Sequence, residues 1–164
     1  MENIKVDVII PAYHPGKEFS TLIERLTKQT FPIHRIIVMN TEKAFWNEKG
    51  FEGISDLQVH HLTKAEFDHG RTRNQGAGHS EADVMVFMTQ DALPADKSLI
   101  ENLVKALTED EKTGAAYARQ LPNENCSFVE KYTRSFNYPD RSAVKTKDDL
   151  PVYGIKTFFC SNVC

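Results

Sequence analysis

Two periodicities of apolar residues alternate along this chain, one typical of buried strands and one typical of helices. Residues 6–12, 35–40 and 84–88 are short, mostly apolar runs bounded by proline or polar residues, and such runs are typical of strands. Residues 84–88 hold five apolar side chains without a charge, and this run predicts a fully buried strand. Leu57–Leu62 is a weaker strand of the same kind.

Apolar residues at helical spacing fill the intervals between these strands. Residues 17–29 and 96–109 each place several apolar side chains on one face, so both are predicted to be amphipathic helices. Residues 70–80 are predicted to form a third helix, in which the glycines and Ala77 allow close packing on a sheet. Residues 41–56 are polar with interspersed aromatics, and we expect a connection there with one short helix.

The alternation of strands and helices predicts an α/β fold, with a mostly parallel sheet and helices on both of its faces. Residues 114–121 are predicted to form a fifth strand. The pattern loosens beyond Pro122. Residues 126–137 are predicted to be helical, and residues 138–153, which are rich in charge and contain two prolines, are predicted to form a surface loop.

Composition narrows the class of protein. The chain has 164 residues, 40% hydrophobic and 26% charged, as expected of a single soluble domain with a real core. A net charge of −3 without a basic stripe makes nucleic acid an unexpected partner. No apolar run approaches the roughly 20 residues of a membrane span, and the N-terminus lacks the pattern of a secretory signal. Three cysteines without a CxxC pair fit a reducing compartment, so we expect the cytoplasm.

Residues suited to ligand binding follow each predicted strand. In a parallel sheet the carboxyl ends of the strands meet along one edge, which is where open α/β sheets bind their ligands. The candidates are Pro11, Ala12 and Tyr13 after the first strand, Asn40 after the second, Asp68, His69, Arg71 and Arg73 after the third, and Gln90 and Asp91 after the fourth.

These residue types suit a nucleoside diphosphate. Tyr13 can stack on a base, and Asn40 can hydrogen-bond a base edge with its donor and its acceptor. Arg71 and Arg73 begin a helix, where backbone amides and guanidinium groups together suit a diphosphate. Asp91 can hold a divalent ion that bridges the same diphosphate. Each of these residues also has a purely structural explanation; Asp91, for example, can cap the next turn or helix. The binding hypothesis therefore depends on all of these residues meeting at one edge of the sheet.

The segments VDVIIPAYHPGKEFSTLIERLTKQTF and TRNQGAGHSEADVMVFMTQDALP resemble the nucleotide-binding half of family 2 glycosyltransferases with the Rossmann-like GT-A fold. FDHGRTRNQGA together with TQDALP is most similar to the rhamnosyltransferase-type members of bacterial cell-surface polysaccharide synthesis. The resemblance covers nearly the whole chain. It implies inverting, metal-assisted transfer of a sugar, rhamnose above others, from a dTDP- or UDP-sugar donor to a saccharide or lipid-linked acceptor.

The resemblance also implies roles by position. Pro11, Ala12 and Tyr13 match the loop that lies against the nucleotide base. Asn40 stands where most members have an aspartate that contacts the base. Arg73 matches the family's arginine near the nucleotide or its phosphates, and Arg71 is its neighbour.

The family's DxD motif appears here as Thr89-Gln90-Asp91. Asp91 matches the last acid of the motif, which binds Mg²⁺ or Mn²⁺ through the diphosphate, while Thr89 replaces the first acid. Magnesium is commonly held by one or two carboxylates plus substrate phosphates, so the site remains feasible. Asp68, His69 and Gln90 are expected to shape the loops or contact the donor sugar.

The catalytic base is not identified. In the family it lies downstream of the segment resembling KTFFCSNVC, where this sequence ends. Asp148 and Asp149 precede that segment, in the predicted surface loop. We therefore expect residues 1–164 to be one nucleotide-sugar-binding domain from the N-terminal part of a longer transferase. Residues 1–121 would form its core, and residues 122–164 a loop and an incomplete acceptor-side region.

Other functions stay open. The chain can be a catalytically inactive nucleotide-sugar-binding module, or a nucleotidyltransferase, although HPGK at 14–17 is a poor match to the glycine-rich loop of that class. A zinc site at His60, His61 and His69 is not expected, because adjacent strand residues point to opposite faces. A homodimer and peripheral attachment at the inner face of the cell membrane also stay open.

Overall fold

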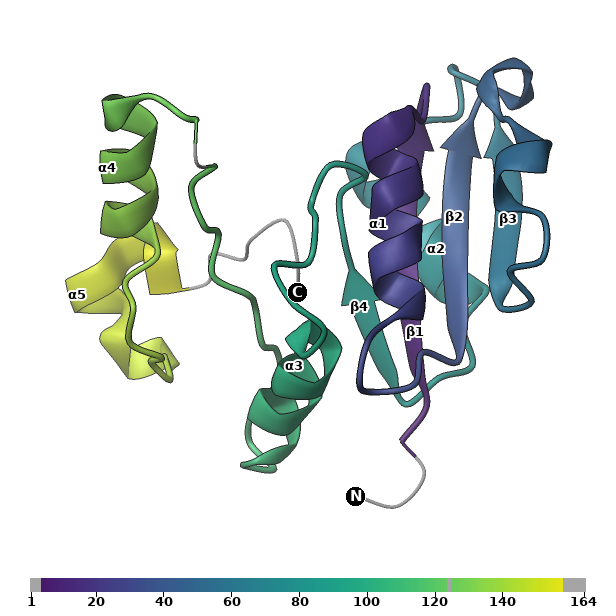
Figure 1. Ribbon diagram of the computed structural model, residues 1–164. Helices are drawn as coiled ribbons and strands as arrows, with labels where there is room; N and C mark the ends of the chain where they lie inside the picture. The colour runs from purple at the N-terminus through teal and green to yellow at the C-terminus, as the bar shows by residue number, and fades with distance from the viewer. Residues whose placement is uncertain (1–3, 124, 158–164) are drawn as a thin grey trace.

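The computed structural model describes residues 4–123 and 125–157. A four-stranded, wholly parallel sheet with the order β3-β2-β1-β4 forms its centre (Figure 1). The strands are β1 (Val6–Tyr13), β2 (Arg35–Thr41), β3 (Leu57–Leu62) and β4 (Val84–Phe87), and the helices are α1 (Lys17–Thr27), α2 (His69–Gly78), α3 (Leu99–Thr108), α4 (Phe128–Asn137) and α5 (Leu150–Tyr153). Short 3₁₀ helices lie at Lys43–Phe45, Glu48–Phe51, Lys147–Asp149 and Gly154–Thr157.

Helices cover both faces of the sheet, which confirms the predicted α/β architecture. On one face, Val8 and Ile10 of β1 share a buried cluster with residues of α1 and α3, such as Phe19 and Leu103. On the other face, Ile9 lies in a second cluster beneath α2, which Figure 1 shows behind the sheet. β1 is therefore buried from both sides.

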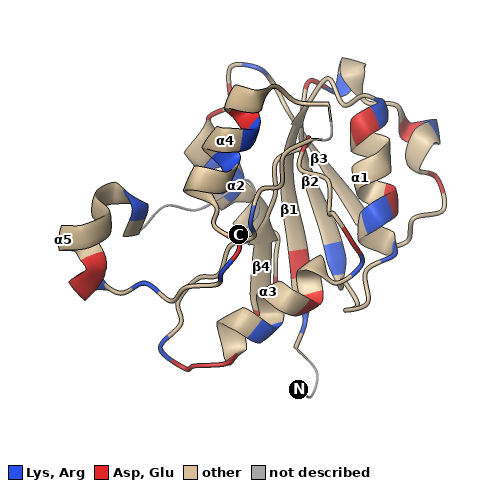
Figure 2. Cartoon of the chain, turned by 60° about the vertical axis from the view of Figure 1, so that its left-hand side comes forward, with Lys and Arg blue, Asp and Glu red and all other residues tan. Residues whose placement is uncertain are grey.

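The pattern of α1 explains its orientation. Phe19, Leu22 and Leu26 are buried against the sheet, and the acidic and basic residues lie exposed near the two ends of the helix (Figure 2). The helix ends at Thr27, two residues before the predicted end. Gln29 lies beyond that end and binds the start of α3, because its side-chain amide donates to the Asp96 carbonyl oxygen at 3.0 Å and its oxygen accepts from the Ile100 amide at 3.1 Å.

Two strand predictions were wrong. The run at 84–88 is not fully buried, since Met85 is 41% exposed. β4 is an edge strand, and α2 packs on β1 and β2 instead of on β4. Residues 114–121 have no regular secondary structure. Ala116 and Ala118 pack against the core, but the segment forms no strand ladder with any described residue.

The predicted surface loop at 138–153 also needs correction. It contains the 3₁₀ helix at Lys147–Asp149 and the short helix α5. A capping box starts this helical segment, because the Asp149 carboxylate accepts hydrogen bonds from the backbone amide and the hydroxyl of Thr146, at 2.7 and 3.1 Å. The apolar end of the chain, 158–164, lies outside the described residues.

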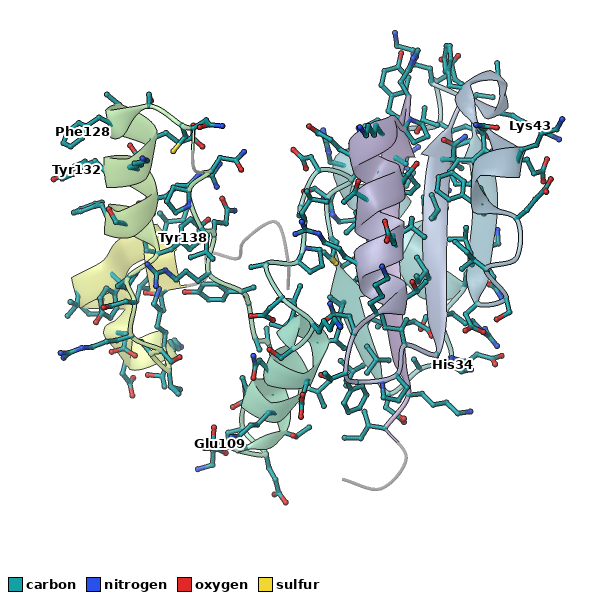
Figure 3. The ribbon with its side chains drawn as sticks, viewed as in Figure 1. His34, Lys43, Glu109, Phe128, Tyr132 and Tyr138 are labelled. Atoms are coloured by element: carbon teal, nitrogen blue, oxygen red, sulfur yellow. The ribbon has the colours of Figure 1, made fainter. Side chains whose placement is uncertain are left out.

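A buried carboxylate ties the sheet together at the end where β1 and β2 begin. Asp7 lies in β1, and its side chain is fully buried. His34 Nδ1 lies 2.9 Å from one carboxylate oxygen, and the Ser80 hydroxyl donates to the other at 2.7 Å. His34 and Lys43 mark the two opposite ends of β2 in Figure 3, with Lys43 at the end that carries the candidate residues.

The described part of the segment from 122 onward contributes little to the core. Among the described residues, the buried hydrophobic side chains other than Tyr138 all lie between residues 6 and 104. Phe128 and Tyr132 are strongly exposed and project from α4 on the side away from the sheet (Figure 3). The division into 1–121 and 122–164 stays a prediction. Among residues 4–123 and 125–157, none of the helices has the length and apolar character that a membrane span requires.

Gly76 is the point of closest approach between α2 and the sheet. A Cβ there would lie 2.5 Å from Ile9 Cγ2 and 3.2 Å from Met39 Cγ. We expect Gly76→Ala to lower the free energy of unfolding by about 1–2 kcal/mol, since overpacking outweighs the better helix propensity of alanine. Urea denaturation measures this. Gly78→Ala is the matched control, because a Cβ there meets nothing within 4 Å. Equal stability of Gly76→Ala and wild type would contradict the close packing.

Candidate functional site

The carboxyl ends of the strands lie side by side at the edge near Lys43 (Figure 3). In the register of the sheet, Ala12 of β1 pairs with Asn40 of β2, and Asn40 pairs with His61 of β3. Tyr13 pairs with Thr41 in the next position. The structure therefore brings the predicted residues of the first two strands into direct contact.

Gln90 brings the fourth strand into the same site. Its side-chain oxygen accepts from the Tyr13 backbone amide at 2.7 Å, and its amide group donates to the Tyr13 carbonyl oxygen at 3.1 Å. This pair of bonds continues the contact between β1 and β4 beyond the last residue of β4. Gln90 thus acts as a loop-shaping residue and holds the segment of Asp91 beside Tyr13. The Asp91 side chain is exposed and makes no hydrogen bond or ion pair with the described residues.

Three aromatic rings bridge the loops after β1 and β2. The rings of His14 and Phe45 are stacked with centroids 3.3 Å apart, and Tyr13 meets each of them edge-on. Tyr13 and Phe45 are each 41% exposed, so they offer aromatic surface to a ligand. Phe45 is a candidate that the sequence analysis did not select, although the aromatic residues within polar 41–56 were the signal for it.

Asn40 is fully buried, and its donor group is already engaged. Its Nδ2 donates to the Glu42 carbonyl oxygen at 3.2 Å and lies 3.0 Å from His61 Nδ1. Its Oδ1 has no partner among the described residues. The expectation that Asn40 offers both a donor and an acceptor to a base is therefore reduced to the acceptor.

The start of α2 carries the predicted arginines, but two of its amides are occupied. Asp68 is the N-cap, and its carboxylate accepts from the Gly70 and Arg71 amides at 3.1 and 2.8 Å. The Arg71 amide bond is the main reason why the pKa of Asp68 is lowered. Arg73 donates to the His69 carbonyl oxygen at 2.8 Å, and Arg71 is exposed. The guanidinium groups, not the Gly70 and Arg71 amides, remain for an anionic ligand.

His60 and His61 point to opposite faces of β3, as predicted. The His60 ring stacks on His79 with centroids 3.7 Å apart, while His61 meets Asn40 and Trp46. Burial lowers the pKa of both histidines, and it is the largest cause in each case. Within 4–123 and 125–157, no group of three or more histidine, cysteine or acidic side chains is arranged to hold a metal ion.

Residues 7–164 match the family model described as Glycosyl transferase family 2. The chain belongs to this family. Its family 2 relatives include the O-antigen chain rhamnosyltransferase RfbN of Salmonella typhimurium, which is 32% identical over 160 residues, or 97% of this chain and 51% of that protein. The O-antigen chain rhamnosyltransferase WbaN of Salmonella anatum is 30% identical over 94% of this chain and 49% of its own length. The chain thus spans about half the length of these relatives.

Solved structures support the same fold. Residues 1–349 of S. aureus TarS superimpose with a TM-score of 0.54 at 22% identity, over 65% of this chain and 33% of that one. The complex of TarS 1–349 with UDP-GlcNAc gives a TM-score of 0.51 at 23% identity, over 65% of this chain and 32% of that one. The predicted GT-A fold and the resemblance to rhamnosyltransferase-like members of family 2 are confirmed.

The stacked pair His60–His79 makes stability depend on pH. The pKa of His60 is lowered from its ordinary value of 6.5, by burial first and by the charge of His79 second. The folded state therefore binds fewer protons, so stability is complete above about pH 6.5 and is lost as the pH falls through the folded pKa. We expect His60→Leu to weaken this decline in urea denaturation curves between pH 7.5 and 5. His69→Leu, at an exposed position, should leave it intact. An unchanged decline in His60→Leu would contradict this assignment.

Proposed function

We propose that this family 2 protein transfers rhamnose from a dTDP- or UDP-linked donor to a saccharide or lipid-linked acceptor of a cell-surface polysaccharide, with inversion at the anomeric carbon. The observation that carries the proposal is the Gln90–Tyr13 pair of hydrogen bonds, which sets the carboxylate-bearing segment beside the exposed aromatic residues. Two relatives at 30–32% identity are named as rhamnosyltransferases, which supports rhamnose as the sugar.

The geometry supports binding of the donor's base and its diphosphate in two different parts of the site. The base would lie against Tyr13 and Phe45, near Pro11, Ala12 and Asn40 at the ends of β1 and β2. Aromatic faces suit this contact because any nucleobase has a flat face to stack on them. The diphosphate would lie nearer α2, where Arg71 and Arg73 supply cationic donors suited to phosphate oxygens.

Asp91 fits the role of a metal ligand. Its carboxylate is exposed, has no partner among the described residues and is held at the strand edge by the neighbouring Gln90. A single carboxylate is a feasible protein ligand for Mg²⁺ or Mn²⁺ when substrate phosphates supply further oxygens. Such an ion, when bound, would neutralise charge that develops on the leaving diphosphate.

The catalytic base is not assigned to a described residue. An inverting transfer needs a carboxylate that takes the proton of the acceptor hydroxyl as it attacks the anomeric carbon. Asp149 is a poor choice because its carboxylate is engaged in the capping box with Thr146. We place the protein in the cytoplasm, with peripheral contact to the inner face of the membrane where a lipid-linked acceptor would be met.

Nucleotide binding that depends on Asp91 tests this function. Thermal and urea unfolding would be measured with dTDP, UDP and GDP, with and without Mn²⁺. A nucleotide at about 100 times its Kd should add roughly 2.7 kcal/mol to the free energy of unfolding. Asp91→Asn should abolish the part of this gain that requires Mn²⁺, while Asp148→Asn, at a distant exposed carboxylate, should retain it.

Three results would separate the alternatives. Equal Mn²⁺-dependent gains in Asp91→Asn and wild type would contradict the assigned metal ligand. Nucleotide binding without rhamnose transfer from dTDP-rhamnose would favour an inactive binding module. A folded protein that no nucleotide stabilises would overturn the proposed donor site.

A further inference from the structure

The side-chain oxygen of Asn40 is a buried acceptor that the fold leaves without a partner. Oδ1 has no hydrogen bond within the described chain, and Asn40 as a whole is fully buried. Buried polar atoms without partners are uncommon in folded proteins, and each one requires an explanation. This atom lies at the strand edge where the base is proposed to bind, between Ala12 and His61 in the register of the sheet.

The contacts of Asn40 Nδ2 determine which protonation state His61 must have. A carbonyl oxygen can only accept, so the Asn40 atom that faces the Glu42 carbonyl at 3.2 Å must be the amide nitrogen. The same nitrogen lies 3.0 Å from His61 Nδ1. Since Nδ2 is a donor, Nδ1 must be an acceptor, and His61 must be neutral with its proton on Nε2.

We propose that His61 is a positioning residue for base recognition: it accepts from Asn40 Nδ2 and thereby keeps Asn40 Oδ1 directed at the nucleotide base. An acceptor at this point selects bases whose central Watson–Crick edge atom is an N–H donor. Uracil and thymine present N3–H, whereas N3 of cytosine is an acceptor and would be repelled. The inference rests on the proposed dTDP- or UDP-linked donor and adds His61 as the residue that orients Asn40 toward its base.

A base would reach this atom through a rearrangement of the loops at this edge, because Oδ1 is buried when no ligand is present. Glu42 and His14 are the two residues other than glycine with positive φ, 66° and 49°, among those described. Such strained backbone commonly accompanies ligand-binding loops.

Protonation of His61 is the most direct way to test its role in positioning Asn40, because the ring keeps its shape while Nδ1 changes from acceptor to donor. The groups that face His61 are Asn40 and Trp46, the cation of Lys43 and the carboxylate of Glu48, and its neighbour on β3 is His60. A protonated His61 would oppose Nδ2 and leave the Glu42 carbonyl alone to hold the Asn40 amide in this orientation, so Oδ1 would be less firmly directed at the base.

The experiment measures Kd for UDP, dTDP and CDP by calorimetry with the full 164-residue chain at saturating Mg²⁺, from about pH 7.5 to pH 5. The ratio of Kd for CDP to Kd for UDP cancels the titration of the phosphates, and the same ratio in His61→Gln corrects for protonation of cytosine N3 at the acid end of the range. We expect a ratio of about 10 or more at pH 7.5. UDP gains a hydrogen bond from its N3–H to Asn40 Oδ1, whereas CDP would place its N3 acceptor against that oxygen. The ratio should fall several-fold as His61 becomes protonated, with circular dichroism confirming a folded protein at each pH.

His61→Gln is the conservative variant, because its amide oxygen can accept from Asn40 Nδ2 but does not titrate. It should keep the preference for UDP at every pH, and the exposed position of His61 makes the substitution compatible with folding. Equal affinities for UDP and CDP at pH 7.5 would overturn the proposed acceptor. A ratio that does not change with pH in the wild-type protein would overturn the role of His61. Failure of all three nucleotides to bind would instead overturn the proposed function on which the inference rests.

Discussion

The burial of β1 between two helical layers is the constraint on which the rest of the structure depends. Its residues alternate between the α1 and α3 side and the α2 side, so a shift of one residue would exchange every core contact. That constraint fixes the register with β2 and sets Ala12 opposite Asn40. Core packing thus determines the relative positions of the strand ends in the candidate site. Loop residues such as Gln90 only extend the contacts between the strands.

The same constraint explains how much of the fold the sequence predicts. Strands buried on both sides give continuous apolar runs, and amphipathic helices such as α1 give a clear helical period, so their boundaries were placed within about three residues. The errors in the sheet concern burial and pairing. An apolar run does not reveal whether it forms an edge strand, as β4 shows, and a segment such as 114–121 does not reveal whether a partner strand is present.

The candidate site was predictable in its location but not in its hydrogen bonds. The residues at the strand ends converge because parallel strands end at one edge, which is a property of topology. The side-chain partners depend on three-dimensional contacts between residues far apart in sequence. Neither the pairing of Gln90 with the Tyr13 backbone nor the use of the Asn40 donor by Glu42 and His61 has a signature in residue spacing.

The two ends of the sheet differ in whether their buried polar groups are hydrogen-bonded. Where β1 and β2 begin, both Asp7 oxygens are hydrogen-bonded, and this end serves the fold. At the carboxyl edge, Asn40 Oδ1, Thr41 Oγ1 and Thr89 Oγ1 are buried without partners among the described residues. An unsatisfied buried group costs about 1–3 kcal/mol, so stability is lost where the candidate residues gather. A ligand that supplied the missing partners would recover part of that free energy as affinity, and such a difference is expected when one edge of a sheet is kept for binding.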